Sequence, residues 1–130
     1  MVIDTSVLAA ILFLEPERPA LIRAMNAAPH LLISAVSLVE MAAVLLRRGS
    51  PEIEAELDSL LERAGVVVIA VDEAQAMIAR GAYRRFGRGI HKAGLNLGDC
   101  FSYALASATG EQLLFKGNDF GETDIAAASY

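Results

Sequence analysis

The sequence begins with Val2-Ile3-Asp4-Thr5-Ser6, a short apolar run that ends on a carboxylate and is followed by two hydroxyl residues. This order predicts a buried strand that stops at Asp4, with Thr5 or Ser6 capping a helix over residues 5–13. In an open α/β sheet, ligands bind in the crevice beyond the carboxyl ends of the strands. The pentapeptide therefore predicts that Asp4 is held at such a crevice.

The rest of the chain alternates between strand and helix patterns. Further strands are predicted over residues 31–33, 66–71 and 112–115, and further helices over residues 16–28, 34–48, 51–64, 72–86 and 99–109. Gly49 would end the helix over 34–48, and Ser50 would open the next one. The run Val66–Val71 lacks alternation, as expected of a strand covered on both faces. Residues 1–130 are thus predicted to form one three-layer α/β/α domain with a mostly parallel central sheet of four to five strands.

Composition restricts the classes of protein to which the chain can belong. Hydrophobic residues make up 55% of it and its mean hydropathy is +0.44. No uncharged apolar stretch reaches the roughly 18–20 residues of a membrane span, and Asp4 stands where a signal peptide would begin with basic residues. We therefore expect a cytoplasmic protein without membrane association, whose apolar surplus is covered by a protein partner or a second copy.

The supply of soft metal ligands is small. Cys100 is the only cysteine, and His30 and His91 are the only histidines. An intrachain disulfide and a thiolate metal cluster are therefore excluded, and a histidine-rich metal site is disfavoured. Any metal ion here would be a hard one held by oxygen ligands.

Charge is unevenly distributed along the chain. The net charge of −5 argues against broad, nonspecific nucleic-acid binding. Five of the 11 basic residues nevertheless gather in one short segment, which consists of Arg80, Arg84, Arg85, Arg88 and Lys92. We call residues 80–92 the basic segment.

Four carboxylates stand where a ligand site would form, and each also has a purely structural interpretation. Asp4 and Asp99 suit helix N-caps, and Asp119 suits a turn. Glu40 completes a capping box if Ser37 caps its helix, but it lies nearly two turns inside the helix if Ser34 is the cap. The local sequence leaves these alternatives open.

The joint placement of these acids favours a site. Two of them follow strands and two lie near helix starts, so one edge of the sheet would bring all four together. Carboxylates about 5 Å apart repel by roughly 3 kcal/mol per pair at an effective dielectric constant of about 20, so such a cluster needs a cation. Oxygen ligands select Mg²⁺ or Mn²⁺, and a water molecule on the ion can become the nucleophile in phosphoryl transfer.

Several motifs occur in a characteristic order. They are the Val-Ile-Asp-Thr-Ser start, the mid-helix Glu40, Leu-Gly-Asp-Cys at 97–100 and Leu-Leu-Phe-Lys-Gly-Asn-Asp-Phe at 113–120, continued by Gly-Glu-Thr-Asp at 121–124. This order resembles the PIN-domain nucleases, and more closely the VapC toxins of bacterial VapBC toxin–antitoxin pairs, over essentially the whole chain. The resemblance implies a PIN-like fold and an endoribonuclease that depends on Mg²⁺, with Mn²⁺ as a substitute, and acts as the toxin of a type II pair.

The resemblance also implies roles for individual residues. Asp4 and Asp99 would be the principal metal ligands, and Asp119 would bind a second metal ion or its water shell. Glu40 would complete the acidic site and help to orient the attacking water. Thr5 or Ser6 would orient Asp4. Asn118 and Asp124, which lie close to Asp119 in the sequence, are further candidates to orient the metal ligands.

The partners implied by the resemblance account for two features of composition. A homodimer and a VapB-type antitoxin, whose C-terminal segment wraps the toxin and obstructs its site, would cover the apolar surplus. RNA is the implied substrate, and its phosphates would contact the basic segment through Arg84, Arg85, Arg88 and Lys92. The alternative is that this segment is an ordinary exposed helix and loop.

Rival functions fit the sequence less well. A Mg²⁺-dependent phosphatase of the haloacid-dehalogenase type would use Asp4 as nucleophile and need a second aspartate two residues later, where the chain has Ser6. The glycine fingerprint of dinucleotide-binding proteins and the Gly-x-Ser-x-Gly motif of serine hydrolases are both absent. The phosphatase and a catalytically silent PIN-like interaction domain are kept as alternatives.

Overall fold

A computed structural model describes residues 1–48 and 51–130. Its strands are β1 (Val2–Ile3), β2 (Leu31–Ser34), β3 (Val66–Ile69) and β4 (Leu113–Leu114). Its helices are α1 (Thr5–Leu12), α2 (Arg18–Ala27), α3 (Ala35–Arg48), α4 (Pro51–Ala64), α5 (Glu73–Phe86), α6 (Leu97–Thr109) and the short 3₁₀ helix η1 (Phe120–Glu122). The predicted roles of Gly49 and Ser50 at helix ends lie outside the described residues. None of the described helices is both long and apolar enough to cross a membrane.

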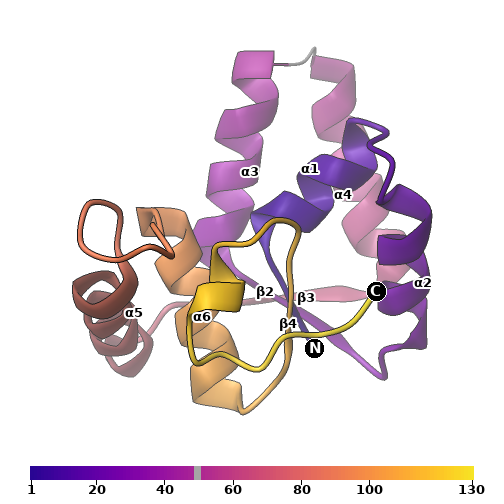
Figure 1. The fold of residues 1–130 in the computed structure, drawn as a ribbon. Helices are drawn as coiled ribbons and strands as arrows, with labels where there is room; N and C mark the ends of the chain where they lie inside the picture. Colours follow the sequence, from indigo (N-terminus) through magenta and orange to yellow (C-terminus); the bar gives the residue numbers. More distant parts are fainter. Residues whose placement is uncertain (49–50) are drawn as a thin grey trace.

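The four strands form one parallel sheet in the order β3-β2-β1-β4 (Figure 1). Val2 of the central strand β1 pairs with Leu32 of β2 and with Leu113 of β4. The chain runs from β1 through β2 to β3 in one direction, and it returns to the other side of β1 for β4. The carboxyl ends of β1 and β4 therefore flank the point where strand order reverses, which is where open α/β sheets bind ligands.

Helices cover both faces of the sheet, as the three-layer prediction requires. Successive residues of a strand point to opposite faces. Ile3 accordingly packs among side chains of α1, α2, α3 and α4, whereas Val2 packs among those of α5 and α6. Figure 1 shows α5 on the opposite side of the molecule from α2 and α4. Both residues of β1 are fully buried, so the strand that carries Asp4 is fixed from both faces.

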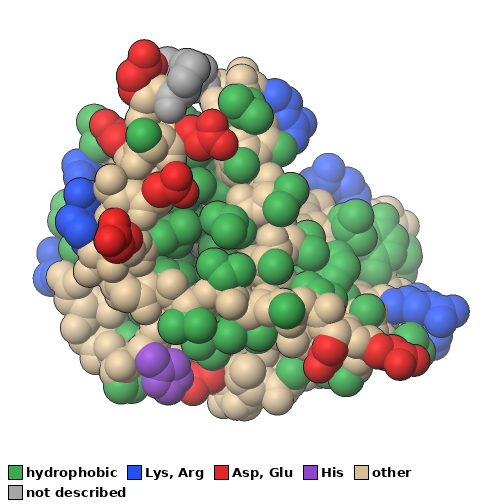
Figure 2. Space-filling view, turned by 180° about the vertical axis from the view of Figure 1, so that it is seen from behind, with side chains coloured by type: hydrophobic (Ala, Val, Ile, Leu, Met, Phe, Trp, Pro, Cys, Tyr) green, Lys and Arg blue, Asp and Glu red, His purple; other side chains and the backbone are tan. Residues whose placement is uncertain are grey.

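Strand β3 contradicts the prediction of a strand covered on both faces. It is an edge strand, because within the described residues it pairs only with β2. Val67 is 51% exposed and Val68 is 44% exposed. Figure 2 shows hydrophobic side chains gathered across the middle of the face on which this edge lies. The unbroken run of β-branched residues thus marks an uncovered strand that leaves apolar surface open to a partner.

The first helix start also differs from the prediction. Neither Thr5 nor Ser6 caps α1, because Asp4 itself is the N-cap and its Oδ2 accepts a hydrogen bond from the Ser6 amide at 2.9 Å. At α3 the choice between the two serines falls on Ser34, whose Oγ accepts from the Val36 amide at 3.3 Å.

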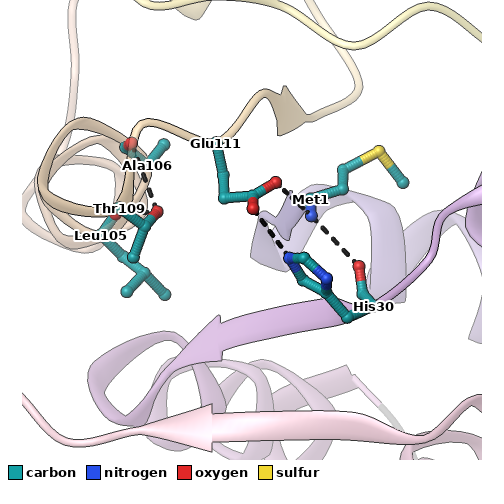
Figure 3. Close-up of polar contacts among 6 residues, drawn as sticks. All are labelled: Met1, His30, Leu105, Ala106, Thr109 and Glu111. Atoms are coloured by element: carbon teal, nitrogen blue, oxygen red, sulfur yellow. Dashed lines mark hydrogen bonds and ion pairs between the residues drawn. The ribbon is translucent and has the colours of Figure 1, made fainter.

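Charged contacts fasten the amino-terminal end of the sheet (Figure 3). The Met1 amino group donates to Glu111 Oε2 at 2.7 Å and to the His30 carbonyl oxygen at 3.1 Å, and His30 Nε2 lies 2.7 Å from Glu111 Oε1. Hydrogen bonds from the amino group and from His30 lower the pKa of Glu111. These three residues precede β1, β2 and β4, so they hold the strand starts together at the end of the sheet opposite Asp4.

Candidate active site

A pocket of about 280 Å³ opens at the carboxyl ends of β1 and β4. It is lined by side chains from the starts of α1 and α6, from α3 and from the segment after β4: Asp4, Thr5, Ser6, Glu40, Val44, Asn96, Asp99, Lys116, Asp119 and Phe120. All four carboxylates that the sequence predicted at this edge are among them. We call this the acidic pocket.

Asp4 is held on both carboxylate oxygens and is only 3% exposed. Its Oδ2 accepts from the Ser6 amide at 2.9 Å and from the Ser6 hydroxyl at 2.6 Å, and its Oδ1 accepts from the Ser102 hydroxyl at 2.7 Å. Ser102 is fully buried, and its Oγ lies 3.1 Å from that of the equally buried Ser37. The helix cap and the pocket acid are therefore one and the same residue, so the two interpretations of Asp4 do not exclude each other.

Glu40 reaches the acidic pocket from inside α3. Because α3 begins two residues before Ser37, the capping box does not form, and Glu40 Oε2 accepts instead from the Thr5 hydroxyl at 2.9 Å. Burial raises the pKa of Glu40, the Thr5 hydrogen bond lowers it, and the charge of Asp4 raises it again. A Cβ atom added at Gly98 would overlap the Glu40 carboxylate, so this placement requires a glycine at 98.

The local sequence suggested that Asp99 is the N-cap of its helix. Asp99 lies instead in the first turn of α6. Asn96 is the cap, and the two residues form a reciprocal capping box: Asn96 Oδ1 accepts from the Asp99 amide at 2.9 Å, and Asp99 Oδ2 accepts from the Asn96 amide at 2.7 Å. Burial raises the pKa of Asp99 from 3.8 to about 7; the Asn96 hydrogen bond opposes this, and the charges of Asp4, Glu40 and Asp119 add to it. The four acids are thus close enough to act on one another.

Asp119 stands at the rim of the acidic pocket. It is exposed, and it precedes η1 without making a side-chain capping bond there. The segment that carries it is tied to Asp4 through Ser6, because the Lys116 amide donates to the Ser6 hydroxyl at 3.0 Å and that hydroxyl donates to Asp4. Ser6 therefore links the ends of β1 and β4.

Two residues expected to support the site lie elsewhere. Asn118 is exposed and does not line the acidic pocket. Asp124 accepts hydrogen bonds from the Tyr103 hydroxyl at 2.6 Å and from the Arg85 guanidinium at 2.7 Å, and these bonds lower its pKa. The structure does not bring Asp124 to the pocket, because this carboxylate fastens the segment after η1 to α5 and α6.

Half of the cations proposed for RNA contact are already paired within the protein. Arg85 pairs with Asp124, and its guanidinium carbon lies 4.5 Å from the centre of the Phe86 ring. Lys92 pairs with Glu122. Arg84 and Arg88 are exposed, and Arg84 lines a groove of about 330 Å³ beside α6.

Sequence patterns did not single out five residues that shape the acidic pocket: Ser37, Asn96, Gly98, Ser102 and Lys116. Helical spacing could have found one of them, because Ser102 follows Asp99 by three positions and so shares its face of α6. The parts played by Gly98 and Lys116 depend on side chains from distant elements and leave no local signal.

The donor set of the acidic pocket fits a hard divalent cation. Its carboxylate and hydroxyl oxygens are the ligands that Mg²⁺ and Mn²⁺ prefer, and a positive ion would relieve the repulsion that helps to raise the pKa of Asp99. In the part of the chain that the structure describes, no three His, Cys, Asp or Glu side chains already stand in an arrangement that could hold a metal ion. Asp4, Glu40 and Asp99 each accept a hydrogen bond from a protein donor, and such bonds commonly orient carboxylates that also bind a metal ion.

Comparison with known sequences places the chain among characterised relatives. Residues 1–126 match the PIN domain. The chain is 52% identical over 127 residues to Ribonuclease VapC of Mycolicibacterium smegmatis, a match that covers 98% of each chain. It is 48% identical over 129 residues to Ribonuclease VapC42 of Mycobacterium tuberculosis, again covering 98% of each.

Solved structures share the fold at lower identity. VapC20 of Mycobacterium tuberculosis, described as a sarcin-ricin loop cleaving toxin, matches with a TM-score of 0.80 and 19% identity, over 99% of this chain and 98% of that one. A toxin–antitoxin complex from Klebsiella pneumoniae matches with a TM-score of 0.72 and 18% identity, over 99% of this chain and 97% of that one. These likenesses confirm the predicted α/β fold.

Proposed function

The chain belongs to the PIN-domain family and, within it, to the VapC ribonucleases, and from this premise we propose that its acidic pocket hydrolyses RNA with a bound divalent metal ion. The observation that carries the proposal is the convergence of Asp4, Glu40, Asp99 and Asp119 on one pocket at the reversal of strand order. The proposed reaction is endonucleolytic. Because its substrate is cellular RNA, we expect the protein to act in the cytoplasm.

Each pocket residue has a part in the proposed reaction. Hydrolysis joins a water oxygen to phosphorus and breaks one phosphorus–oxygen bond, so the water loses a proton and the leaving oxygen gains one. Asp4, Asp99 and Asp119 would hold Mg²⁺ or Mn²⁺, which polarises the phosphate and lowers the pKa of bound water. Glu40 would orient the attacking water and accept its proton, a task for which burial and its raised pKa suit it. Ser6 and Ser102 keep Asp4 in position.

Metal binding should depend on pH through Asp99. Its pKa of about 7 in the folded protein, against 3.8 for the free group, means that the native state retains a proton that the unfolded chain has lost. The stability of the metal-free protein should therefore fall between about pH 4 and pH 7 as pH rises. A bound cation replaces that proton, so 10 mM Mg²⁺ should raise the melting temperature by about 5 °C or more at pH 8 and by less at pH 6.

Thermal melts with Mg²⁺ and with chelator at both pH values check this expectation. Asp99→Asn should remove the dependence on metal and most of the pH dependence, of which the raised pKa of Glu40 leaves a part, while Asp58→Asn on the exposed face of α4 should keep both. A melting temperature that does not respond to Mg²⁺ at pH 8 would argue against the proposed metal site.

The exposed apolar surface supports the proposal of protein partners. Val67 and Val68 on β3 and Val39 and Leu46 on α3 are all at least 44% exposed, and a second copy of the chain would cover part of this surface. Sedimentation equilibrium should then give about twice the monomer mass of 13.8 kDa, and a monomer at all concentrations would remove the dimer. The solved toxin–antitoxin complex of the same fold supports a VapB-type antitoxin as the second partner; its gene would be a small neighbouring reading frame whose product co-purifies with the chain.

The basic segment gives a narrower expectation for RNA contact than the sequence did. Arg84 and Arg88, two of the residues predicted to contact RNA, are exposed and form no ion pair within the described part of the chain, whereas Arg85 and Lys92 have acidic partners. Reversing both charges, as Arg84→Glu and Arg88→Glu, should weaken RNA binding and reduce the slope of its salt dependence by roughly 2. An unchanged slope in a filter-binding titration would exclude these two arginines from the RNA path.

A further inference from the structure

The acidic pocket contains a cation of its own. Among the described residues that line it, Lys116 is the single basic one, and it stands among four carboxylates. Its backbone is fixed, because its amide donates to the Ser6 hydroxyl at 3.0 Å. Its side chain can still move about this anchor, since it is long, flexible and 29% exposed.

The Lys116 ammonium is held by acids that belong to the turn between α1 and α2. It pairs with Glu15, and it lies 3.0 Å from Glu17 Oε2, an oxygen that is buried and makes no well-aligned hydrogen bond. Pairing with these two glutamates raises the pKa of Lys116, so the group is charged at neutral pH. None of the four catalytic carboxylates is its ion-pair partner.

The residue before Glu15 has an energetically unfavourable backbone conformation. Leu14 has φ 57, a left-handed conformation that glycine usually adopts. The Glu15 amide donates to the Ala10 carbonyl at 2.9 Å and the Leu14 amide to the Ile11 carbonyl at 3.4 Å, which is the pattern that ends a helix and fixes the next residue. A strained residue beside a charged contact is a common sign of a functional constraint.

We propose that the Lys116 ammonium binds the phosphodiester of the RNA substrate over the acidic pocket, exchanging Glu15 and Glu17 for a phosphate oxygen. This inference rests on the proposed function. RNA brings negative charge toward four carboxylates, and a single metal ion does not balance them. Lys116 is the charge that the chain itself supplies at that place, and its anchored backbone keeps it within reach of Asp4. When RNA is absent, the two glutamates bind the ammonium group, so that it does not neutralise the acids that a metal ion needs.

The test compares charge removal at Lys116 with charge removal elsewhere. Lys116→Met should lower kcat/KM for a cleavable oligoribonucleotide by about 10- to 100-fold, the usual effect of losing a hydrogen bond to a charged group. In chelator, where no cleavage occurs, the same variant should reduce the salt slope of RNA binding by about 1. Arg23→Met on the exposed face of α2 removes the same unit of charge and should change neither value by more than about twofold.

Two further variants separate this role from a structural one. The double variant Glu15→Gln/Glu17→Gln releases the Lys116 ammonium and should lower KM for RNA. The triple variant, which adds Lys116→Met, leaves no unpaired acids and should fold well. It should cleave RNA as poorly as Lys116→Met alone. Mn²⁺ affinity should stay within about threefold of wild type in Lys116→Met and in the triple variant, because Lys116 is not a metal ligand.

If the wild type cleaves RNA and Lys116→Met cleaves it with the same kcat/KM, the inference is overturned and the proposed function stands. A parallel loss of Mn²⁺ affinity and cleavage in Lys116→Met would also overturn it, because Lys116 would then act through the metal site. If the wild type cleaves no RNA, the proposed function fails, and an unchanged salt slope in Lys116→Met would separately reject the phosphate contact.

Discussion

Replacing Asp4 with asparagine should lower the rate of RNA cleavage by about 10³-fold or more, which corresponds to roughly 4 kcal/mol of transition-state stabilisation. Asp4 is the most deeply buried acid of the pocket, and its carboxylate is oriented by Ser6 and Ser102. Asparagine has the same shape but lacks the charge that a divalent cation requires. The change therefore removes the ligand and keeps the packing of β1.

Single-turnover cleavage of a defined oligoribonucleotide measures this loss, and circular dichroism with a thermal melt shows whether the fold persists. Asp99→Asn should behave in the same way, with the additional rise in metal-free stability at pH 8 that follows from its pKa of about 7. Asp58→Asn on α4 is the matched control for loss of one carboxylate from an exposed position. Full activity in both pocket variants would remove these two aspartates from the reaction.

Gly98→Ala should lower cleavage by about 10²-fold while leaving the protein folded. The added methyl group would overlap the Glu40 carboxylate. Because that carboxylate is the free end of a flexible side chain, Glu40 should move and lose its hydrogen bond from Thr5, without displacement of α6. A base displaced by about 1 Å loses much of its effect on rate.

The chain offers a close control for this glycine. Gly81 lies inside α5, and a Cβ atom added there would meet no atom within 4 Å. Gly81→Ala should therefore keep full activity and stabilise the helix by about 1 kcal/mol. Glu40→Ala should match Gly98→Ala in activity, and the double variant should be no worse than either alone. Additive losses would mean that Gly98 acts on something other than Glu40.

The sequence was sufficient to predict the elements that depend on local signals. The apolar pair before Asp4 predicted β1, and Gly110, with φ 70, ends α6 where the sequence placed its stop. A glycine in the left-handed conformation after a helical pattern is such a local signal, because it needs no partner from elsewhere in the chain.

Strand β3 shows where sequence patterns become ambiguous. An unbroken apolar run is typical of a strand buried between two helical layers. The same run occurs here in an edge strand, where Val67 and Val68 are exposed. The chain alone does not distinguish these cases, because the covering surface need not belong to it.

The candidate site was predicted as a set of acids but not as an arrangement. Asp4, Glu40, Asp99 and Asp119 were singled out correctly as neighbours. Their orientation depends on donors that no spacing rule links to them: Ser102 stands 98 positions from Asp4, and Thr5 stands 35 positions from Glu40. Such contacts arise only when α1, α3 and α6 pack together at the carboxyl edge of the sheet.

The catalytically silent alternative and the phosphatase alternative differ from the proposed function in one observable result. A silent domain cleaves no RNA under any condition, and a phosphatase releases inorganic phosphate without shortening the chain. Neither result depends on which RNA sequence the protein prefers, provided that the substrate pool is diverse.

The most direct test is to incubate the purified protein with a mixed RNA pool in three conditions: with Mg²⁺, with excess chelator, and with excess Mn²⁺ added after the chelator. A metal-dependent endoribonuclease should shorten a subset of the RNAs in the first condition, leave all of them intact in the second, and resume the same cleavages in the third. Asp4→Asn should be inactive throughout. Cleavage that continues at the same rate in chelator, or that Asp4→Asn retains, would contradict the assignment of the acidic pocket as a metal-dependent nuclease site.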